Sequence, residues 1–309
     1  MRAVVFAYHN VGVRCLKTLL AHGVQVDLVV THPDSPTETL WFDRVADVAS
    51  EVGLPVAYVD DAVDDALIDR VAALAPDYLF SFYFRRMLPP PLLAAARIAA
   101  LNMHGSLLPK YRGRVPVNWA VLHGETETGA TLHVMQAKPD AGDIVAQQAV
   151  PILPDDTAKD VFDKLTVAAE IALWNVLPQL QRGEVPRRTN DLATGSYFGG
   201  RKPEDGRIDW TQPAQAVYNL IRAVAPPYPG AFFELQGERF IVARARLARP
   251  ELAGHLAASA PVGPHRLGDQ IVARTADGGA IHLLELWAAG RPDHPLSAQQ
   301  FSNLAGLQS

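Results

Sequence analysis

The chain has 309 residues, 49% of them hydrophobic and 20% charged, with a formal net charge of −5. This balance is ordinary for a globular protein with a sizeable core, and the length exceeds that at which one core usually stops growing, so two domains are expected. A negative net charge gives no global attraction to polyanions, so nucleic acid is not an expected partner.

The cysteine count and the hydropathy pattern predict a cytoplasmic protein. Cys15 is the only cysteine, which rules out an intrachain disulfide and a zinc site made of several thiolates. The apolar run at the N-terminus is short and is interrupted by His9 and Asn10. No later apolar run approaches the roughly 18 residues that a membrane span needs. We expect neither a secretory signal nor membrane insertion.

The N-terminal part alternates short apolar, β-rich runs with amphipathic helical runs. Strands are predicted over Ala3–Tyr8, Val26–Thr31, Val56–Val59 and Tyr78–Phe82, and helices over Val11–His22, Phe42–Val52 and Asp64–Leu74. Continuous apolar strands separated by such helices are typical of a parallel sheet covered on both faces. The fold class is therefore α/β, with a doubly wound, mainly parallel sheet.

Further along the chain, this first domain continues to residue 183. We predict a strand at Leu101–His104, a helix that starts at Pro116 and ends at Gly124, a strand at Thr131–Met135 and a long helix at Thr157–Arg182. Residues 184–206 are rich in Gly, Thr, Asn, Pro and charge, which predicts a linker.

Residues 207–309 show a different period and form a second predicted domain. Antiparallel strands are expected at Phe232–Leu235, Arg239–Arg246, Gln270–Thr275 and Ala280–Trp287, with a hairpin turn at Asp277–Gly279. This pattern favours a small β-barrel or sandwich.

Two polar residues interrupt the apolar strand that ends at residue 104. Asn102 and His104 are two residues apart, so they face the same side of the strand. An imidazole beside an amide donor suits a reaction that passes through a charged tetrahedral intermediate. Open parallel sheets also bind ligands beyond the carboxyl ends of their strands, which is where this pair lies.

A carboxylate can join the pair from the loop after residue 135. Asp140 can reach the same end of the sheet, where it would orient His104 and favour its protonated form. Asp143 competes for this role, and either aspartate alone is most simply a loop or solvated residue.

The loop after His104 carries three cations, Lys110, Arg112 and Arg114. A solvated loop and an anion-binding loop are both compatible with this spacing. No G-x-G-x-x-G, Walker, His-Glu-x-x-His or G-x-S-x-G motif is present, which argues against a conventional dinucleotide site and a serine nucleophile. His123 and His133 are interpreted as packing or surface residues, and no metal site is expected.

The run Asn102–Gly113, NMHGSLLPKYRG, together with the Asp140 segment, resembles the 10-formyltetrahydrofolate-dependent formyltransferases. The resemblance covers essentially the whole chain. It implies a Rossmann-like formyl-transfer domain and a smaller C-terminal β-barrel resembling an OB-fold. It also implies that Asn102 donates a hydrogen bond to the oxyanion, that His104 shuttles the proton, and that Asp140 orients His104 and raises its pKa.

The resemblance also implies where the formyl donor, 10-formyltetrahydrofolate, binds. The residues expected to bind the folate are Arg86, Met87, Leu88, Arg114, Gln136, Ala137, Lys138, Pro139 and Asp140.

Within the family, the chain is most similar to the formyltransferase part of a bifunctional polymyxin-resistance enzyme that formylates UDP-4-amino-4-deoxy-L-arabinose for lipid A modification. The matching residues are Val4–His9, Phe80–Tyr83, Asn118–Trp119, Gly124–Gly129, Phe198–Gly199, Ala223–Ala225 and Pro229–Phe232. A UDP-linked amino sugar is therefore the expected acceptor. We expect Arg201 and Arg222 to bind its phosphates, and a separate dehydrogenase or decarboxylase of the same pathway to supply it.

The sequence leaves two alternative functions to consider. A methionyl-tRNA formyltransferase typically has a basic, glycine-rich insertion after the second strand, whereas Thr31–Leu40 contains no Lys or Arg. A non-catalytic folate- or nucleotide-binding module would have no physical need for Asn102, His104 and Asp140 together. The exact sugar, the oligomeric state and the role of Asp143, which replaces a small residue of that enzyme, are left open.

Overall fold

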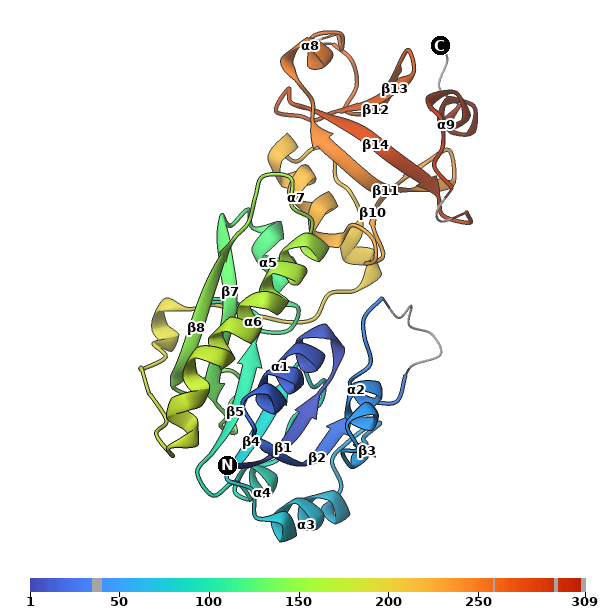
Figure 1. The fold of residues 1–309 in the computed structure, drawn as a ribbon. Helices are drawn as coiled ribbons and strands as arrows, with labels where there is room; N and C mark the ends of the chain where they lie inside the picture. The colour runs from blue at the N-terminus through green and yellow to red at the C-terminus, as the bar shows by residue number, and fades with distance from the viewer. Residues whose placement is uncertain (35–40, 258, 292–293, 307–309) are drawn as a thin grey trace. The chain divides into compact units, whose positions relative to one another are not determined.

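The computed structural model describes residues 1–34, 41–257, 259–291 and 294–306 (Figure 1). The chain forms two compact units. The first consists of Met1–Pro116, Glu127–Pro151 and Phe162–Gly199, and the second of Val117–Thr126, Ile152–Val161 and Gly200–Ser309. The segment 35–40, on which part of the argument against tRNA depends, lies outside the described residues.

A seven-stranded sheet forms the centre of the first unit, in the order β3-β2-β1-β4-β5-β7-β8. Its strands are β1 (Arg2–Ala7), β2 (Gln25–Thr31), β3 (Val56–Tyr58), β4 (Tyr78–Phe82), β5 (Ala99–His104), β7 (Glu127–Val134) and β8 (Ile144–Pro151). The pairs among β1 to β5 are parallel, whereas β7 runs antiparallel to β5 and β8 antiparallel to β7. The predicted doubly wound, mainly parallel sheet is confirmed, with an antiparallel edge.

Helices cover both faces of this sheet (Figure 1). They are α1 (His9–Ala21), α2 (Val45–Glu51), α3 (Asp65–Leu74), α4 (Pro90–Leu93) and most of α6 (Ala158–Gln181), whereas α5 (Pro116–Leu122) belongs almost entirely to the second unit. Val4 and Phe6 of β1 pack in a core with residues of α3 and α4. On α1, Arg14 pairs with Glu170 of α6 at 2.6 Å, so these two helices lie side by side.

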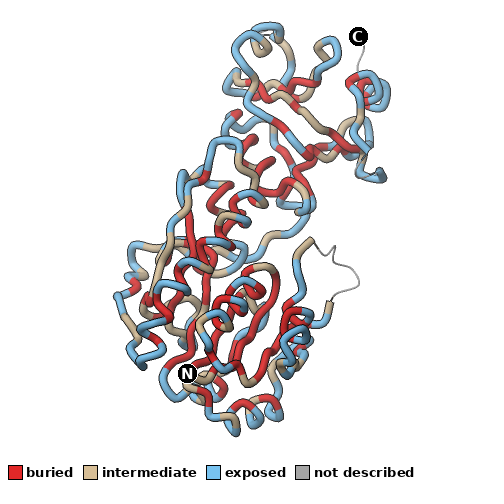
Figure 2. The backbone as a smooth tube through the Cα atoms, in the orientation of Figure 1, coloured by how far each residue is buried: buried red, intermediate tan, exposed pale blue. Residues whose placement is uncertain are grey.

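Burial explains why these sequences form these elements. β1 and β4 are almost entirely buried, because a central parallel strand is covered on both faces (Figure 2). The start of α3 is fixed by Asp64, whose Oδ1 accepts a hydrogen bond from the Leu67 backbone N–H at 2.8 Å. None of the helices in the described part of the chain is long and apolar enough to cross a membrane.

The second unit contains a five-stranded antiparallel sheet in the order β10-β11-β14-β13-β12. The bounds are β10 (Ala231–Leu235), β11 (Glu238–Leu247), β12 (Gly263–Leu267), β13 (Gln270–Arg274) and β14 (Ala280–Ala288), with helices α7 (Ala214–Val224), α8 (Pro250–Ala253) and α9 (Ala298–Ala305). Phe233, Phe240 and Phe301 form its aromatic core. The predicted turn is present, with Asp277 Oδ1 accepting from Thr275 Oγ1 at 2.6 Å.

The segment predicted to be a linker contains regular structure and is divided between the two units at Gly199 and Gly200. It includes the 3-10 turn η1 (Leu192–Thr194), the short strand β9 (Tyr197–Phe198) and the 3-10 turn η2 (Pro203–Gly206). β9 pairs in parallel with β6 (Arg112–Gly113), which lies in the loop after His104. Residues 188–198 therefore belong structurally to the neighbourhood of the predicted site.

Candidate active site

The structure brings the predicted histidine and aspartate together at the end of β5. His104 is buried, with its Nδ1 3.5 Å from Asp140 Oδ1. Its Nε2 lies 2.8 Å from the Tyr111 carbonyl oxygen. Because a carbonyl can only accept, Nε2 carries the proton of the neutral ring, and Nδ1 is the basic atom that faces Asp140.

The long connection between β7 and β8 brings Asp140 into contact with His104. β7 is antiparallel to β5, so its end lies beside the start of β5, where the Met135 N–H donates to the Ala100 carbonyl at 2.8 Å. Residues 135–143 then turn back before β8 begins. Asp140 sits in this connection with a positive φ of 49°.

Two further hydrogen bonds hold Asp140 in place. Its Oδ2 accepts from the Gly113 backbone N–H at 2.9 Å, and its carbonyl oxygen accepts from Asn190 Nδ2 at 3.0 Å. Burial alone would raise the pKa of Asp140, but His104, His133 and the Gly113 N–H together outweigh it and hold that pKa below its usual range. Asp140 is therefore ionised at neutral pH.

The pKa of His104 is lowered, because burial disfavours the imidazolium and the neighbouring His133 acts in the same direction. Asp140 and the hydrogen bond to Tyr111 act to raise this pKa, as the family resemblance implies for Asp140. Burial nevertheless outweighs them, so the pKa of His104 is lowered overall although Asp140 acts to raise it. The resting imidazole is neutral and able to accept a proton at Nδ1, where the Asp140 carboxylate would stabilise the imidazolium.

His133 is a site residue that sequence reasoning missed. It lies directly opposite Asn102 in the β5–β7 pairing, and its Nε2 is 3.0 Å from Asn102 Nδ2 and 3.4 Å from Asp140 Oδ1. Its Nδ1 lies 3.0 Å from the Val134 carbonyl oxygen. His133 was expected to be a packing or surface residue, but it is buried within the constellation. The register of an antiparallel pair would have revealed it, and no sequence motif marks that register.

The contact with His133 fixes the plane of the Asn102 amide. One N–H of Nδ2 is directed at His133 Nε2, which leaves the second N–H as a donor. Asn102 is only partly buried, whereas His104 and His133 are buried. An amide held in one orientation is the arrangement required of an oxyanion donor.

The geometry distinguishes Asp140 from Asp143. The Asp143 side chain is 40% exposed and its Oδ2 lies 3.9 Å from Arg187 Nη1. Asp140 is the aspartate that contacts His104.

The basic loop after His104 is only partly solvated. Arg112 is 8% exposed, whereas Lys110 and Arg114 are exposed. Ser106 Oγ donates to the Lys110 carbonyl at 2.6 Å, so it has a role in loop structure, as expected from the absence of a nucleophile motif.

The residues expected to bind the folate all lie in the first unit. Met87 is 60% exposed, and Gln136, Ala137 and Lys138 are exposed in the connection that carries Asp140. Arg86 is turned toward the 60–61 loop, where its Nε donates to the Asp60 carbonyl at 2.9 Å. Leu88 is buried in the hydrophobic core.

The two arginines expected to bind phosphate lie in the second unit and differ in their surroundings. Arg201 Nη2 donates to the Asp205 carbonyl at 2.8 Å, and its guanidinium lies 4.8 Å from the centre of the Trp119 ring. Arg222 is buried and donates to Asn219 Oδ1 and to the Asp156 carbonyl. These contacts favour a structural role for Arg222 over the expected phosphate contact.

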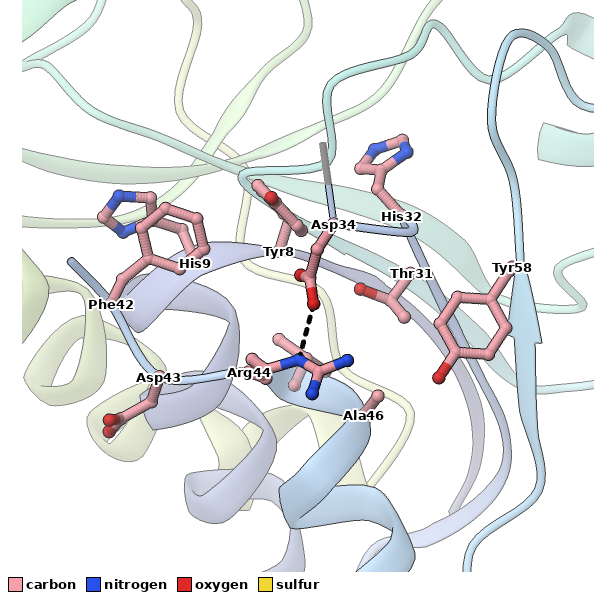
Figure 3. A pocket seen from close by; sticks show the side chains of 11 residues that line it. Tyr8, His9, Thr31, His32, Asp34, Phe42, Asp43, Arg44, Ala46 and Tyr58 are labelled. Carbon is pink, nitrogen blue, oxygen red and sulfur yellow. Dashed lines mark ion pairs between the residues drawn. The ribbon is translucent and has the colours of Figure 1, made fainter. Parts of the chain in front are cut away.

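A separate pocket lies beyond the ends of β1 and β2 (Figure 3). Its lining includes Thr31 at the end of β2, Tyr8 and His32 directly after β1 and β2, and His9 at the start of α1. Arg44 is the only lysine or arginine among its described lining residues, and it pairs with Asp34 at 2.8 Å. Within the described ranges, no three His, Cys, Asp or Glu side chains converge to hold a metal ion.

Comparison with protein families matches both parts of the chain. Residues 1–177 match the model described as "Formyl transferase", and residues 201–304 match "Formyl transferase, C-terminal domain".

Solved structures show the same fold. An N-formyltransferase from Helicobacter canadensis, solved with folinic acid and dTDP-3-aminofucose, is 19% identical with a TM-score of 0.70 over 91% of this chain and 98% of that one. A sugar N-formyltransferase from a Shewanella species is 18% identical, with a TM-score of 0.64 over 81% and 99%. HypX from Aquifex aeolicus, solved with tetrahydrofolic acid, is 18% identical, with a TM-score of 0.63 over 99% of this chain and 47% of HypX.

Proposed function

Because the chain belongs to the formyl transferase family, we propose that it transfers a formyl group from 10-formyltetrahydrofolate to the amino group of a nucleotide-linked amino sugar. The observation that carries this proposal is the contact of His104 Nδ1 with Asp140, beside the fixed amide of Asn102. Acyl transfer needs a group that moves a proton and a donor for the oxyanion, and these residues provide both.

Asn102, His104 and Asp140 have different roles in the proposed reaction. The acceptor nitrogen attacks the formyl carbon, and the free N–H of Asn102 donates to the oxygen that becomes negative. His104 takes the proton from the attacking nitrogen, and the Asp140 charge stabilises the imidazolium. The same proton then passes to the folate nitrogen as its bond to the formyl carbon breaks, which restores neutral His104.

Support for the folate comes from the family and from the solved relatives. The Helicobacter protein was solved with folinic acid, and HypX with tetrahydrofolic acid. In this chain, Met87, Arg114, Gln136, Ala137 and Lys138 are exposed, and Asp140 follows the last three in the same connection. We assign the folate to Arg86–Leu88, Arg114 and Gln136–Asp140.

For the acceptor, the proposal extends to UDP-4-amino-4-deoxy-L-arabinose, in lipid A modification and polymyxin resistance. This choice is supported by the residues that the chain shares with the enzyme acting on this sugar. The broader class of nucleotide amino sugars is supported by the dTDP-3-aminofucose in the Helicobacter structure. The proposal places the reaction in the cytoplasm, with Arg201 as the remaining phosphate candidate and a separate pathway enzyme supplying the amine.

The test is to incubate the protein and 10-formyltetrahydrofolate with three acceptors in parallel: UDP-4-amino-4-deoxy-L-arabinose, a dTDP-linked amino sugar and charged initiator tRNA. Tetrahydrofolate release and the mass of the acceptor are followed. We expect formylation of the UDP sugar at the highest kcat/KM. Formylation of the dTDP sugar instead would replace the UDP acceptor while keeping the class. Formylation of tRNA alone, or of none of the three, would refute the proposal.

A further inference from the structure

Residues 188–198, named the strap, contact both the connection that carries Asp140 and the loop that follows His104. At one end, the strap pairs with the first residue of β8: Arg188 N donates to the Ile144 carbonyl at 2.9 Å, and Ile144 N to the Arg188 carbonyl at 2.8 Å. Next to this bridge, Asn190 is buried and donates from Nδ2 to the carbonyls of Asp140 and Gly142, at 3.0 and 3.1 Å. This end of the strap therefore holds the backbone of Asp140.

The other end of the strap holds the loop after His104. Ser196 Oγ accepts from the Tyr111 N–H at 2.8 Å, and the Ser196 carbonyl accepts from the Arg112 N–H at 3.0 Å. The Phe198 carbonyl accepts from the Arg114 N–H at 3.0 Å, and the Phe198 ring stacks on the Tyr111 ring with centroids 5.5 Å apart. Four contacts thus fix residues 111–114 against the strap.

The same short stretch supplies a hydrogen-bond partner to each catalytic residue. The Tyr111 carbonyl accepts from His104 Nε2 at 2.8 Å, and the Gly113 N–H donates to Asp140 Oδ2 at 2.9 Å. Tyr111 and Gly113 lie on either side of Arg112, which the strap holds by its N–H. A shift of the strap would move both partners together.

Two glycines show how closely the strap packs against the loop after His104. A Cβ at Gly195 would lie 2.2 Å from the Pro109 carbonyl oxygen, and one at Gly113, where φ is +98°, would lie 2.2 Å from the Phe198 carbonyl oxygen. Any larger residue at either position would push the strap and the loop apart.

We propose that the strap is a positioning element for catalysis: through Asn190 and Ser196 it sets the distance between His104 and Asp140 and holds the Tyr111 carbonyl on His104 Nε2. The inference rests on the proposed function only in taking His104 and Asp140 as the residues that carry out transfer. It assigns a role in the active site to a segment that sequence composition marks as a linker.

The strap should influence the titration of His104. The groups that face this imidazole are Asp140 from the β7–β8 connection, His133 from β7 and the Tyr111 carbonyl from the loop. The hydrogen bond to Tyr111 raises the pKa of His104. Weakening the hydrogen bond between His104 and the Tyr111 carbonyl should therefore lower the pKa of His104. A substitution that only lowers the overall stability would leave this pKa unchanged in the folded protein.

The test compares two substitutions within the strap, each of which removes a hydroxyl group. Ser196→Ala removes the acceptor for the Tyr111 N–H, whereas Thr194→Ala, at an exposed residue, removes only a local bond to the Asp191 carbonyl. We expect Ser196→Ala to lower kcat about 10-fold, in keeping with one lost hydrogen bond, with little change in acceptor KM. The NMR titration midpoint of His104 should also fall.

Thr194→Ala should match the wild type, and Ser196→Thr, which keeps the hydroxyl, should restore both kcat and the midpoint. Ser196→Ala with a wild-type kcat and an unchanged midpoint would overturn the inference. So would an equal effect of Thr194→Ala.

The NMR arm separates this inference from the proposed function, because it needs no substrate. A wild-type protein without formyl transfer refutes the proposed function. In that case a lowered His104 midpoint in Ser196→Ala still supports the strap, and an unchanged midpoint overturns it.

Discussion

Replacing Asp140 with asparagine removes the charge that faces His104 and preserves the size of the side chain. The two groups are 3.5 Å apart, and their side chains are only 7% and 12% exposed. At an effective dielectric constant of about 20, unit charges at this distance attract by roughly 5 kcal/mol. Because this energy stabilises the imidazolium as His104 takes up a proton, its loss corresponds to a fall in kcat of between about three and four orders of magnitude.

The assay is steady-state tetrahydrofolate release with a saturating amino-sugar acceptor. Asp143→Asn is the matched control, because Asp143 lies three residues further along the same connection and faces Arg187. We expect the Asp143 variant to retain wild-type kcat and the Asp140 variant to lose it. An Asp140→Asn enzyme within tenfold of wild type would refute the reasoning that this charge stabilises protonated His104.

Three further predictions follow from the same contacts. Asn102→Ala should lower kcat about 100- to 1000-fold, since it removes the proposed oxyanion donor, while calorimetry should show folate affinity close to that of the wild type. His133→Phe should lower kcat about 10-fold by freeing the Asn102 amide, whereas His123→Phe, at an exposed residue, should have wild-type kinetics. Burial lowers the pKa values of His32 and His104 below 6.5, so the unfolded chain takes up protons first as pH falls. The free energy of unfolding in urea should therefore decrease below pH 6.5, and less steeply in His104→Asn; a pH-independent value would contradict this.

The apolar periodicity of the sequence predicted most of the sheet. Tyr78–Phe82 has the same bounds in prediction and structure, and the other parallel strands differ by one or two residues. β8, α7, β12 and α9 were not predicted. β8 is an edge strand with only its first residues buried, so it lacks a continuous apolar run.

Within the site, local spacing predicted that Asn102 and His104 lie on one strand with their side chains on one face, and both residues are in β5. Asp140 and His133 depend on the register of an antiparallel pair and on the path of a long connection. The strap shows the same limit: its composition is that of a linker, and its role depends on contacts with Tyr111 and Asp140 far away in sequence.

The most direct measurement is a single-turnover reaction of the protein with ¹³C-formyl-labelled 10-formyltetrahydrofolate and UDP-4-amino-4-deoxy-L-arabinose, with the sugar product analysed by mass spectrometry. We predict that the wild type places the labelled formyl group on the sugar nitrogen. His104→Asn, tested under conditions where it binds the folate equally, should form no product in the same time. Release of labelled formate without a formylated sugar, or equal product from His104→Asn, would contradict the account.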